Sequence, residues 1–290
     1  MQINFVRYKK LYFVFSGILI LGSLVSLFVF GLKPGIDFTG GSILEIEYKN
    51  SRPSNQEIEE KLAGLDLGQI TVQPTQEKGV IIRMKDISED VHQQILQKLG
   101  KDVFEERRFE AVGSLIGQEL EKKTITLIIF SLVAIVFYIA WAFRKVKKSW
   151  QYALSSLVSL FHDILIPLGV FAVLGKFYGV DISIAVITAL LTVIGGSINN
   201  VIVVFDRVRE NTIKGRGVTF EDTVNKSINQ TLGRCLNTSL AYLLPLLAIF
   251  FFGGVTLKYF SLALIIGITA GTYSAAFLAA PLLTTFKRYA

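Results

Sequence analysis

Cysteine and charge are both scarce in this chain of 290 residues. Cys235 is the only cysteine, so no disulfide can form within the chain and no cysteine-rich metal site is expected. Charged residues make up 18% of the sequence and hydrophobic residues 51%, which is too apolar for a soluble domain with a hydrated surface. Lipid is therefore the expected solvent for most of the chain.

The net charge of +7 is unevenly distributed, which argues against a nucleic-acid-binding surface. Residues 33–123 contain 13 Lys and Arg and 17 Asp and Glu, a net charge of −4, whereas the rest contains 17 and 6, a net charge of +11. Most of the cations in the second group lie in short segments beside apolar runs, as they do in membrane proteins. We expect membrane lipids as partners, and neither nucleic acid, metal nor cofactor.

Six apolar stretches are long enough to cross a hydrocarbon layer about 30 Å thick, which takes roughly 20 helical residues. The first follows a basic start, but it is too long for a signal peptide and lacks a small-residue cleavage site, so we expect it to remain as a span. The predicted spans are residues 11–31, 124–143, 152–174, 182–205, 233–252 and 257–285.

Positive charge predicts which side of each span is cytoplasmic, because Lys and Arg in short loops resist translocation. Basic residues concentrate in segments 1–10, 144–148, 206–232 and 286–290. We therefore expect both termini in the cytoplasm and residues 32–123 on the outer side.

Residues 32–123 have the patterns of a small α+β domain. Leu44, Ile46 and Tyr48 alternate with charged residues, as in a half-buried strand. Ser54 and Glu57 have the spacing of a capping box, which predicts a helix start. With the later elements the order is βαββαβ, a ferredoxin-like unit. The fold class is thus an all-α bundle of six transmembrane helices with one extracytoplasmic ferredoxin-like domain, in which His92 is expected on the surface.

Polar residues inside predicted spans are candidates for function, because a charged side chain at a helix centre costs at least about 2.5–3.5 kcal/mol to insert. The third span carries His162 and Asp163, the fourth Asn199 and Asn200, and the fifth begins with Arg234. Asp163 is the one midspan carboxylate and hence the natural partner of Arg234. Two interpretations remain open, a hydrogen-bond network that holds helices together and a transport-linked relay or switch.

Two other groups accompany these spans. In the sixth span Gly267 and Gly271 belong to a stripe of small residues every four positions, which predicts close helix packing. The fourth span ends at a charged cytoplasmic cluster, made of Asp206, Arg207, Arg209 and Glu210.

Several motifs in order along the chain resemble the SecF branch of the SecD/SecF family of the bacterial Sec export machinery. The most specific follows the first span and reads Gly35-Ile36-Asp37-Phe38-Thr39-Gly40-Gly41, in which the glycines permit a tight exit turn and Asp37 can cap backbone amides. The other matching groups are His162-Asp163, Ser197-Ile198-Asn199, Val204 to Asn211, Asn229 to Arg234, Phe252 to Gly254, and Gly271 to Ser274.

The resemblance implies a non-enzymatic subunit of the resistance-nodulation-division superfamily in the bacterial cytoplasmic membrane. It implies pairing with SecD, binding to the SecYEG channel, and help in exporting unfolded preproteins after the SecA step, driven by the proton-motive force or another ion gradient. The alternatives are an exporter of small molecules or lipids from the same superfamily, which normally has larger external domains and twelve spans, and an intramembrane enzyme, for which no nucleophile or metal set is apparent.

The chain departs from the family at one position of the implied proton path. That path uses an aspartate in the fourth span and an arginine in the fifth. The arginine corresponds to Arg234, but the aspartate position is Asn200, whose amide does not titrate. Either Asp163 or a SecD carboxylate carries the proton, or proton coupling is lost, or another ion is used.

Overall fold

The computed structural model describes residues 3–75, 77–142, 144, 149–215 and 217–286. The chain forms two compact units, which are described separately: residues up to 33 together with those from 127 onward, and residues 34–126. Most of the predicted basic segment 144–148, and residues 287–290, lie outside the described residues.

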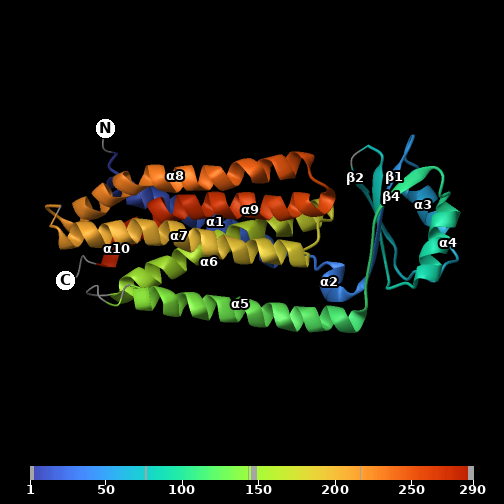
Figure 1. The fold of residues 1–290 in the computed structure, drawn as a ribbon, viewed down its shortest axis with the longest axis horizontal. Helices are drawn as coiled ribbons and strands as arrows, with labels where there is room; N and C mark the ends of the chain where they lie inside the picture. The colour runs from blue at the N-terminus through green and yellow to red at the C-terminus, as the bar shows by residue number, and fades with distance from the viewer. Residues whose placement is uncertain (1–2, 76, 143, 145–148, 216, 287–290) are drawn as a thin grey trace. The chain divides into compact units, whose positions relative to one another are not determined.

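The first unit is built of long apolar helices that run alongside one another (Figure 1). Six helices among the described residues are long and apolar enough to cross a membrane, which confirms the predicted bundle. They are α1 (Lys9–Phe30), α5 (Ser114–Ala142), which starts in the second unit, α6 (Ser149–Tyr178), α7 (Ile184–Ile213), α8 (Phe220–Phe252) and α9 (Val255–Ser274). The last continues through a π-helical segment, Ala275–Ala279, into α10 (Ala280–Phe286).

The helices extend beyond the predicted spans. Segment 206–232, expected as a loop, is mostly helical, because α7 continues to Ile213 and α8 begins at Phe220. The Thr219 hydroxyl accepts a hydrogen bond from the Asp222 amide and the Asp222 carboxylate accepts one from the Thr219 amide, a capping box that begins α8. Apolarity ends where a span ends, whereas a helix continues as far as its caps allow.

Helices α6, α7 and α9 form the centre of the first unit. About half of the most hydrophobic window of each is buried within the chain, compared with 6% for α1 and α5 and 11% for α8. Small residues bring the central helices together: a Cβ atom added to Gly267 would lie 2.3 Å from Val193 Cγ2, and one added to Gly271 would lie 3.0 Å from Ser197 Cβ. The stripe of small residues on α9 therefore packs directly on α7.

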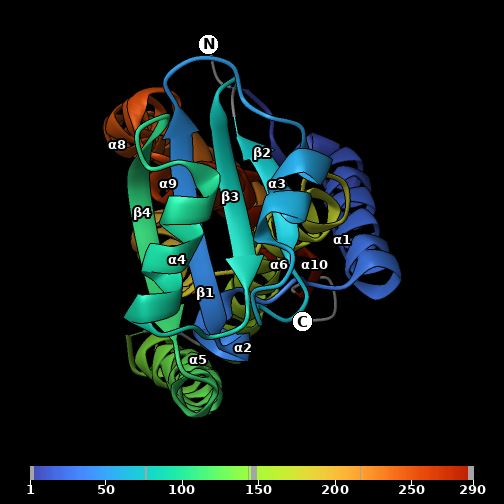
Figure 2. The ribbon, with the colours of Figure 1, turned by 90° about the vertical axis from the view of Figure 1, so that its right-hand side faces the viewer.

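The second unit is a four-stranded antiparallel sheet with two helices on one face (Figure 2). Its elements are β1 (Gly41–Tyr48), α3 (Asn55–Leu62), β2 (Thr71–Thr75), β3 (Gly79–Met84), α4 (Glu89–Leu99) and β4 (Phe104–Val112), preceded by the short helix α2 (Ile36–Thr39). The strand order β2-β3-β1-β4 confirms the predicted βαββαβ unit. The capping box of Ser54 and Glu57 is formed as the spacing indicated.

His92 is buried, so the expectation of a surface histidine is wrong. Its side chain lies on the face of α4 that also buries Ile95 and Leu99, and only 4% of the residue is exposed. The imidazole stacks on Phe109, with ring centroids 3.8 Å apart, and its Nδ1 lies 3.2 Å from the Glu89 carboxylate. The face of the imidazole is therefore buried like that of an apolar ring, while its nitrogen Nδ1 contacts the Glu89 carboxylate.

We predict that Gly267→Ala destabilises the first unit, because the new methyl group would overlap the stiff side chain of Val193. Overpacking of this kind costs about 1–3 kcal/mol. The matched control is Gly233→Ala in α8, where a Cβ would meet no atom within 4 Å. Thermal unfolding of the detergent-purified chain should show a lower melting temperature for Gly267→Ala only; equal melting temperatures would contradict close packing at Gly267.

Candidate functional site in the membrane helices

Asp163 on α6 is completely buried among three helices. Its Oδ2 accepts hydrogen bonds from the Ser197 hydroxyl of α7 and from the Ser274 hydroxyl of α9, the latter at 2.7 Å. Its Oδ1 lies 2.8 Å from Nδ1 of His162, which is also completely buried. A carboxylate in a membrane needs such donors to replace water. The single side chain of Asp163 therefore joins α6, α7 and α9.

The serines form a directed chain that ends at this carboxylate. Ser159 of α6 donates a hydrogen bond to Ser274 Oγ at 2.8 Å, and Ser274 in turn donates to Asp163. The hydroxyl of Ser155, one helical turn before Ser159, is buried without a hydrogen-bond partner among the described residues. The polar residues of the third span thus face protein rather than lipid.

One ring nitrogen of His162 has a hydrogen-bond partner among the described residues, and the other has none. Nδ1 faces Asp163, whereas Nε2 is buried and has no hydrogen-bond partner among the described residues. The ring stacks against Tyr273 of α9 with centroids 5.9 Å apart. The Tyr273 hydroxyl donates to the Tyr12 carbonyl at 3.2 Å and accepts from the Ser16 hydroxyl at 3.3 Å, which links this network to α1.

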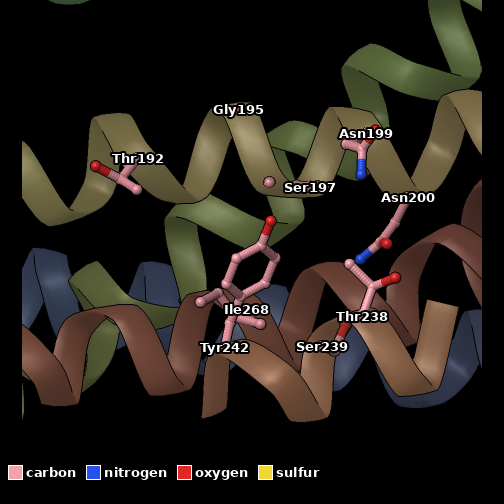
Figure 3. Close-up of a pocket in the computed structure, with 10 residues that line it drawn as sticks. Thr192, Gly195, Ser197, Asn199, Asn200, Thr238, Ser239, Tyr242 and Ile268 are labelled. Atoms are coloured by element: carbon pink, nitrogen blue, oxygen red, sulfur yellow. The ribbon is translucent and has the colours of Figure 1, made fainter. Parts of the chain in front are cut away.

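Asn200 lines a pocket of about 300 Å³ (Figure 3), which also includes Ser197, one of the donors to Asp163. The close-up shows Asn200 of α7 reaching toward Thr238 of α8. Gly195 and Gly196 leave room, since a Cβ at either would meet no atom within 4 Å. The lining residues are Thr192, Gly195, Gly196, Ser197, Asn199, Asn200, Thr238, Ser239, Tyr242 and Ile268. None of these ten side chains is acidic or basic.

Arg234 does not pair with Asp163, so the pairing that the sequence favoured is wrong. Asp163 is paired with His162 and faces α7 and α9, whereas Arg234 lies on the exposed side of α8. Asn237 on α8 and Asn199 on α7 are exposed as well. In this chain alone, Arg234 and Asn237 therefore point out of the helix bundle, whereas Asn199 is exposed at the pocket that it lines with Asn200.

The exit-turn motif consists of Gly35, Asp37, Gly40 and Gly41 and lies at the start of the second unit. Gly40 and Gly41 have φ angles of +74° and +124°, which L-residues rarely adopt. A Cβ on Gly40 would lie 2.7 Å from the Ser114 Cα, and one on Gly41 would lie 2.8 Å from the Met84 carbonyl oxygen. Both glycines are required by conformation and by space. Gly35, in extended conformation, precedes α2, and Asp37 lies in its first turn.

The charged cluster at the end of α7 connects this helix to α8. Arg207 Nη1 lies 2.5 Å from the Glu210 carboxylate and its Nε donates to Gln230 of α8 at 2.7 Å. Asp206 lies 3.7 Å from Arg209, a weaker contact on the same helix. Asn211 also donates to Gln230, at 2.8 Å. Among the four residues of the cluster, Arg207 is therefore the one that links α7 to α8.

Sequence reasoning did not find the donors of Asp163. Ser197 and Ser274 stand inside matching motifs, yet no residue pattern indicated that they meet, because Ser274 is 111 positions from Asp163. Tyr273 and Ser16 were missed for the same reason. Among the described residues, no group of three or more His, Cys, Asp or Glu could hold a metal ion.

Comparison with known families identifies the architecture. The family described as "Protein export membrane protein SecD/SecF, C-terminal" matches residues 91–289, and the "SecD/SecF GG Motif" matches residues 25–51, which include Gly40 and Gly41.

Relatives match over almost the whole chain. The protein translocase subunit SecF of Thermobaculum terrenum is 39% identical over 99% of this chain and 94% of its own length. The protein translocase subunit SecDF of Brucella abortus is 34% identical over 98% of this chain but only 38% of its own length.

A solved structure also matches over almost the whole of this chain. The crystal structure of SecDF from Thermus thermophilus, a translocon-associated membrane protein, superposes with a TM-score of 0.87 at 29% identity, covering 99% of this chain and 39% of that one. By sequence and by fold, the chain belongs to the SecD/SecF family of protein export membrane proteins.

Proposed function

We propose that the chain is a SecF-type subunit that assists the export of preproteins across the bacterial cytoplasmic membrane. The observation that carries this proposal is the match to proteins named translocase subunit SecF along almost the entire length of both chains. The subunit acts as a transport component rather than an enzyme. It works on unfolded preprotein at the SecYEG channel, after the ATP-dependent step of SecA.

SecD is the proposed immediate partner. The relatives named SecDF are single chains of which this chain corresponds to 38–39%, so a separate SecD would supply most of the remainder. The exposed polar groups of α7 and α8 support this assignment. Arg234, Asn237 and Asn199 are costly in contact with lipid and need a polar partner surface.

An ion gradient is the proposed energy source, with residues 32–123 outside and both termini in the cytoplasm. Moving one charge through 100 mV is worth about 2.3 kcal/mol, which is enough to bias a conformational cycle. The pocket at Asn200 carries no titratable side chain other than Tyr242, so it does not supply a carboxylate from this chain.

The proposed topology predicts the outcome of cysteine labelling. In a Cys235→Ser background, a cysteine placed at the exposed position Lys61 should react with a membrane-impermeant reagent added from outside, and one at the exposed position Lys214 should not. Labelling of intact cells against opened membranes measures this. The reverse pattern would exclude the export role as stated.

Arg234→Leu tests the partner surface. We expect this variant to reduce preprotein translocation in membrane vesicles while SecD still copurifies, because one charge is lost from a broad interface. The control is Lys258→Leu, which removes a half-buried cation in the first turn of α9. Translocation at the unaltered rate in Arg234→Leu would make this arginine dispensable.

Asn200→Asp tests the pocket at Asn200. The substitution introduces a titratable carboxylate where the family carries one, so translocation should acquire a stronger dependence on the pH gradient. Asn200→Gln is the matched control, because it keeps an uncharged amide in the same place. Equal gradient dependence in both variants would show that the pocket takes no part in proton coupling.

A further inference from the structure

We propose that His162 and Asp163 form the intramembrane proton-binding site of this chain, with the transferable proton held on Nε2 of His162. The site itself follows from the geometry of α6, α7 and α9. Its use for export rests on the proposed function. The ligand is a single proton delivered by water, and no metal or organic ligand is involved.

The hydrogen bonds around Asp163 indicate where protons already reside. Both carboxylate oxygens face donors: Oδ2 accepts from two serine hydroxyls and Oδ1 faces His162 Nδ1. This arrangement suits an ionised Asp163 and a histidine with its proton on Nδ1. The His162 Nε2 lone pair is then free to accept a proton without breaking any of these bonds.

The two protonation states of the pair differ in net charge. With neutral His162 the buried pair carries a charge of −1, and with a proton on Nε2 it carries none. An uncompensated charge in hydrocarbon is costly, whereas a contacting ion pair is much less so. The pair therefore operates as a one-proton unit whose two states differ by a full charge at 0% exposure.

The neighbours of the pair add no competing charge. From α9 the titratable group facing His162 is Tyr273, whose hydroxyl donates to the backbone carbonyl of Tyr12 on α1. From α7 the facing residue is Ser197, which does not titrate. The π-helical segment 275–279 and α10 contain no titratable residue. Among the described contacts, the charge of the site is set by His162 and Asp163 alone.

Ser274 connects the charge of the site to the backbone of α9. Its hydroxyl donates to Asp163 but also lies 3.3 Å from the carbonyl oxygen of Gly271, a second acceptor. The π-helical segment Ala275–Ala279 begins at the next residue. Such segments are mechanically irregular and recur at functional sites. When His162 takes up a proton, Asp163 is compensated, and Ser274 can turn to Gly271, which releases the end of α9 from α6.

The histidine content of the chain permits a direct test. The only two histidines are His92 and His162, so ¹⁵N-histidine labelling of the full chain with His92→Gln in lipid nanodiscs gives signals from His162 alone. As the pH is lowered from about 8 to about 5, the ¹⁵N shifts should convert from the neutral form with a proton on Nδ1 to the imidazolium. Asp163→Asn should abolish the conversion and Asp163→Glu should preserve it. A His162 that stays neutral throughout, or titrates unchanged in Asp163→Asn, would overturn the proposal.

A second measurement separates the site from its use. In membrane vesicles with the SecD partner, His162→Asn should reduce the gradient-dependent part of translocation, by up to about 50-fold for one coupled charge at 100 mV. Ser26→Ala, which removes an exposed serine hydroxyl bound to the Gly22 carbonyl of α1, should have no effect. Unchanged gradient dependence in His162→Asn would refute the coupling. If the chain without any substitution did not support export, the proposed function would be refuted. The ¹⁵N titration would still show whether His162 and Asp163 bind a proton.

Discussion

A fully buried carboxylate constrains how the helices of the first unit pack. Asp163 must obtain hydrogen bonds from protein, and the donors come from three different elements, His162 beside it, Ser197 on α7 and Ser274 on α9. The helices must therefore approach closely at this depth. Gly271 permits that approach, since its missing side chain leaves room for Ser197 of α7. Close packing and charge compensation are thus two aspects of one requirement.

The polar groups of the membrane unit fall into two sets with different partners. His162 and Asp163 are satisfied or paired within the chain, whereas Arg234 and Asn237 of α8 and Asn199 of α7 are exposed. An apolar bilayer does not solvate the exposed set, so it indicates a protein surface to be covered. Asn200, between the two sets, lines a pocket without a carboxylate. If the proposed roles hold, the place where a proton is held is separate from the surface where a second subunit docks.

The second unit shows how much of a fold can be predicted from local sequence patterns. The alternation in β1 and the capping box of α3 each lie within a few residues, and both elements formed as predicted. His92 was misjudged because its sequence neighbours are polar, although the buried face of α4 is defined by Ile95 and Leu99 one and two turns away. Stacking on Phe109 of β4 then provides a contact that no local pattern contains.

The sequence by itself determined the number of membrane helices, the βαββαβ order and the family, because hydrophobic length, periodicity and short motifs are local properties. It also identified His162, Asp163, Asn200 and Arg234 as groups that are costly in lipid. Only the tertiary structure decided which of them meet. Asp163 pairs with His162 and with Ser274, 111 positions away, and not with Arg234. The physical reason is that packing of residues such as Gly267 against Val193 sets how each helix is rotated about its own axis. That rotation decides which polar side chains face each other and which face out of the bundle.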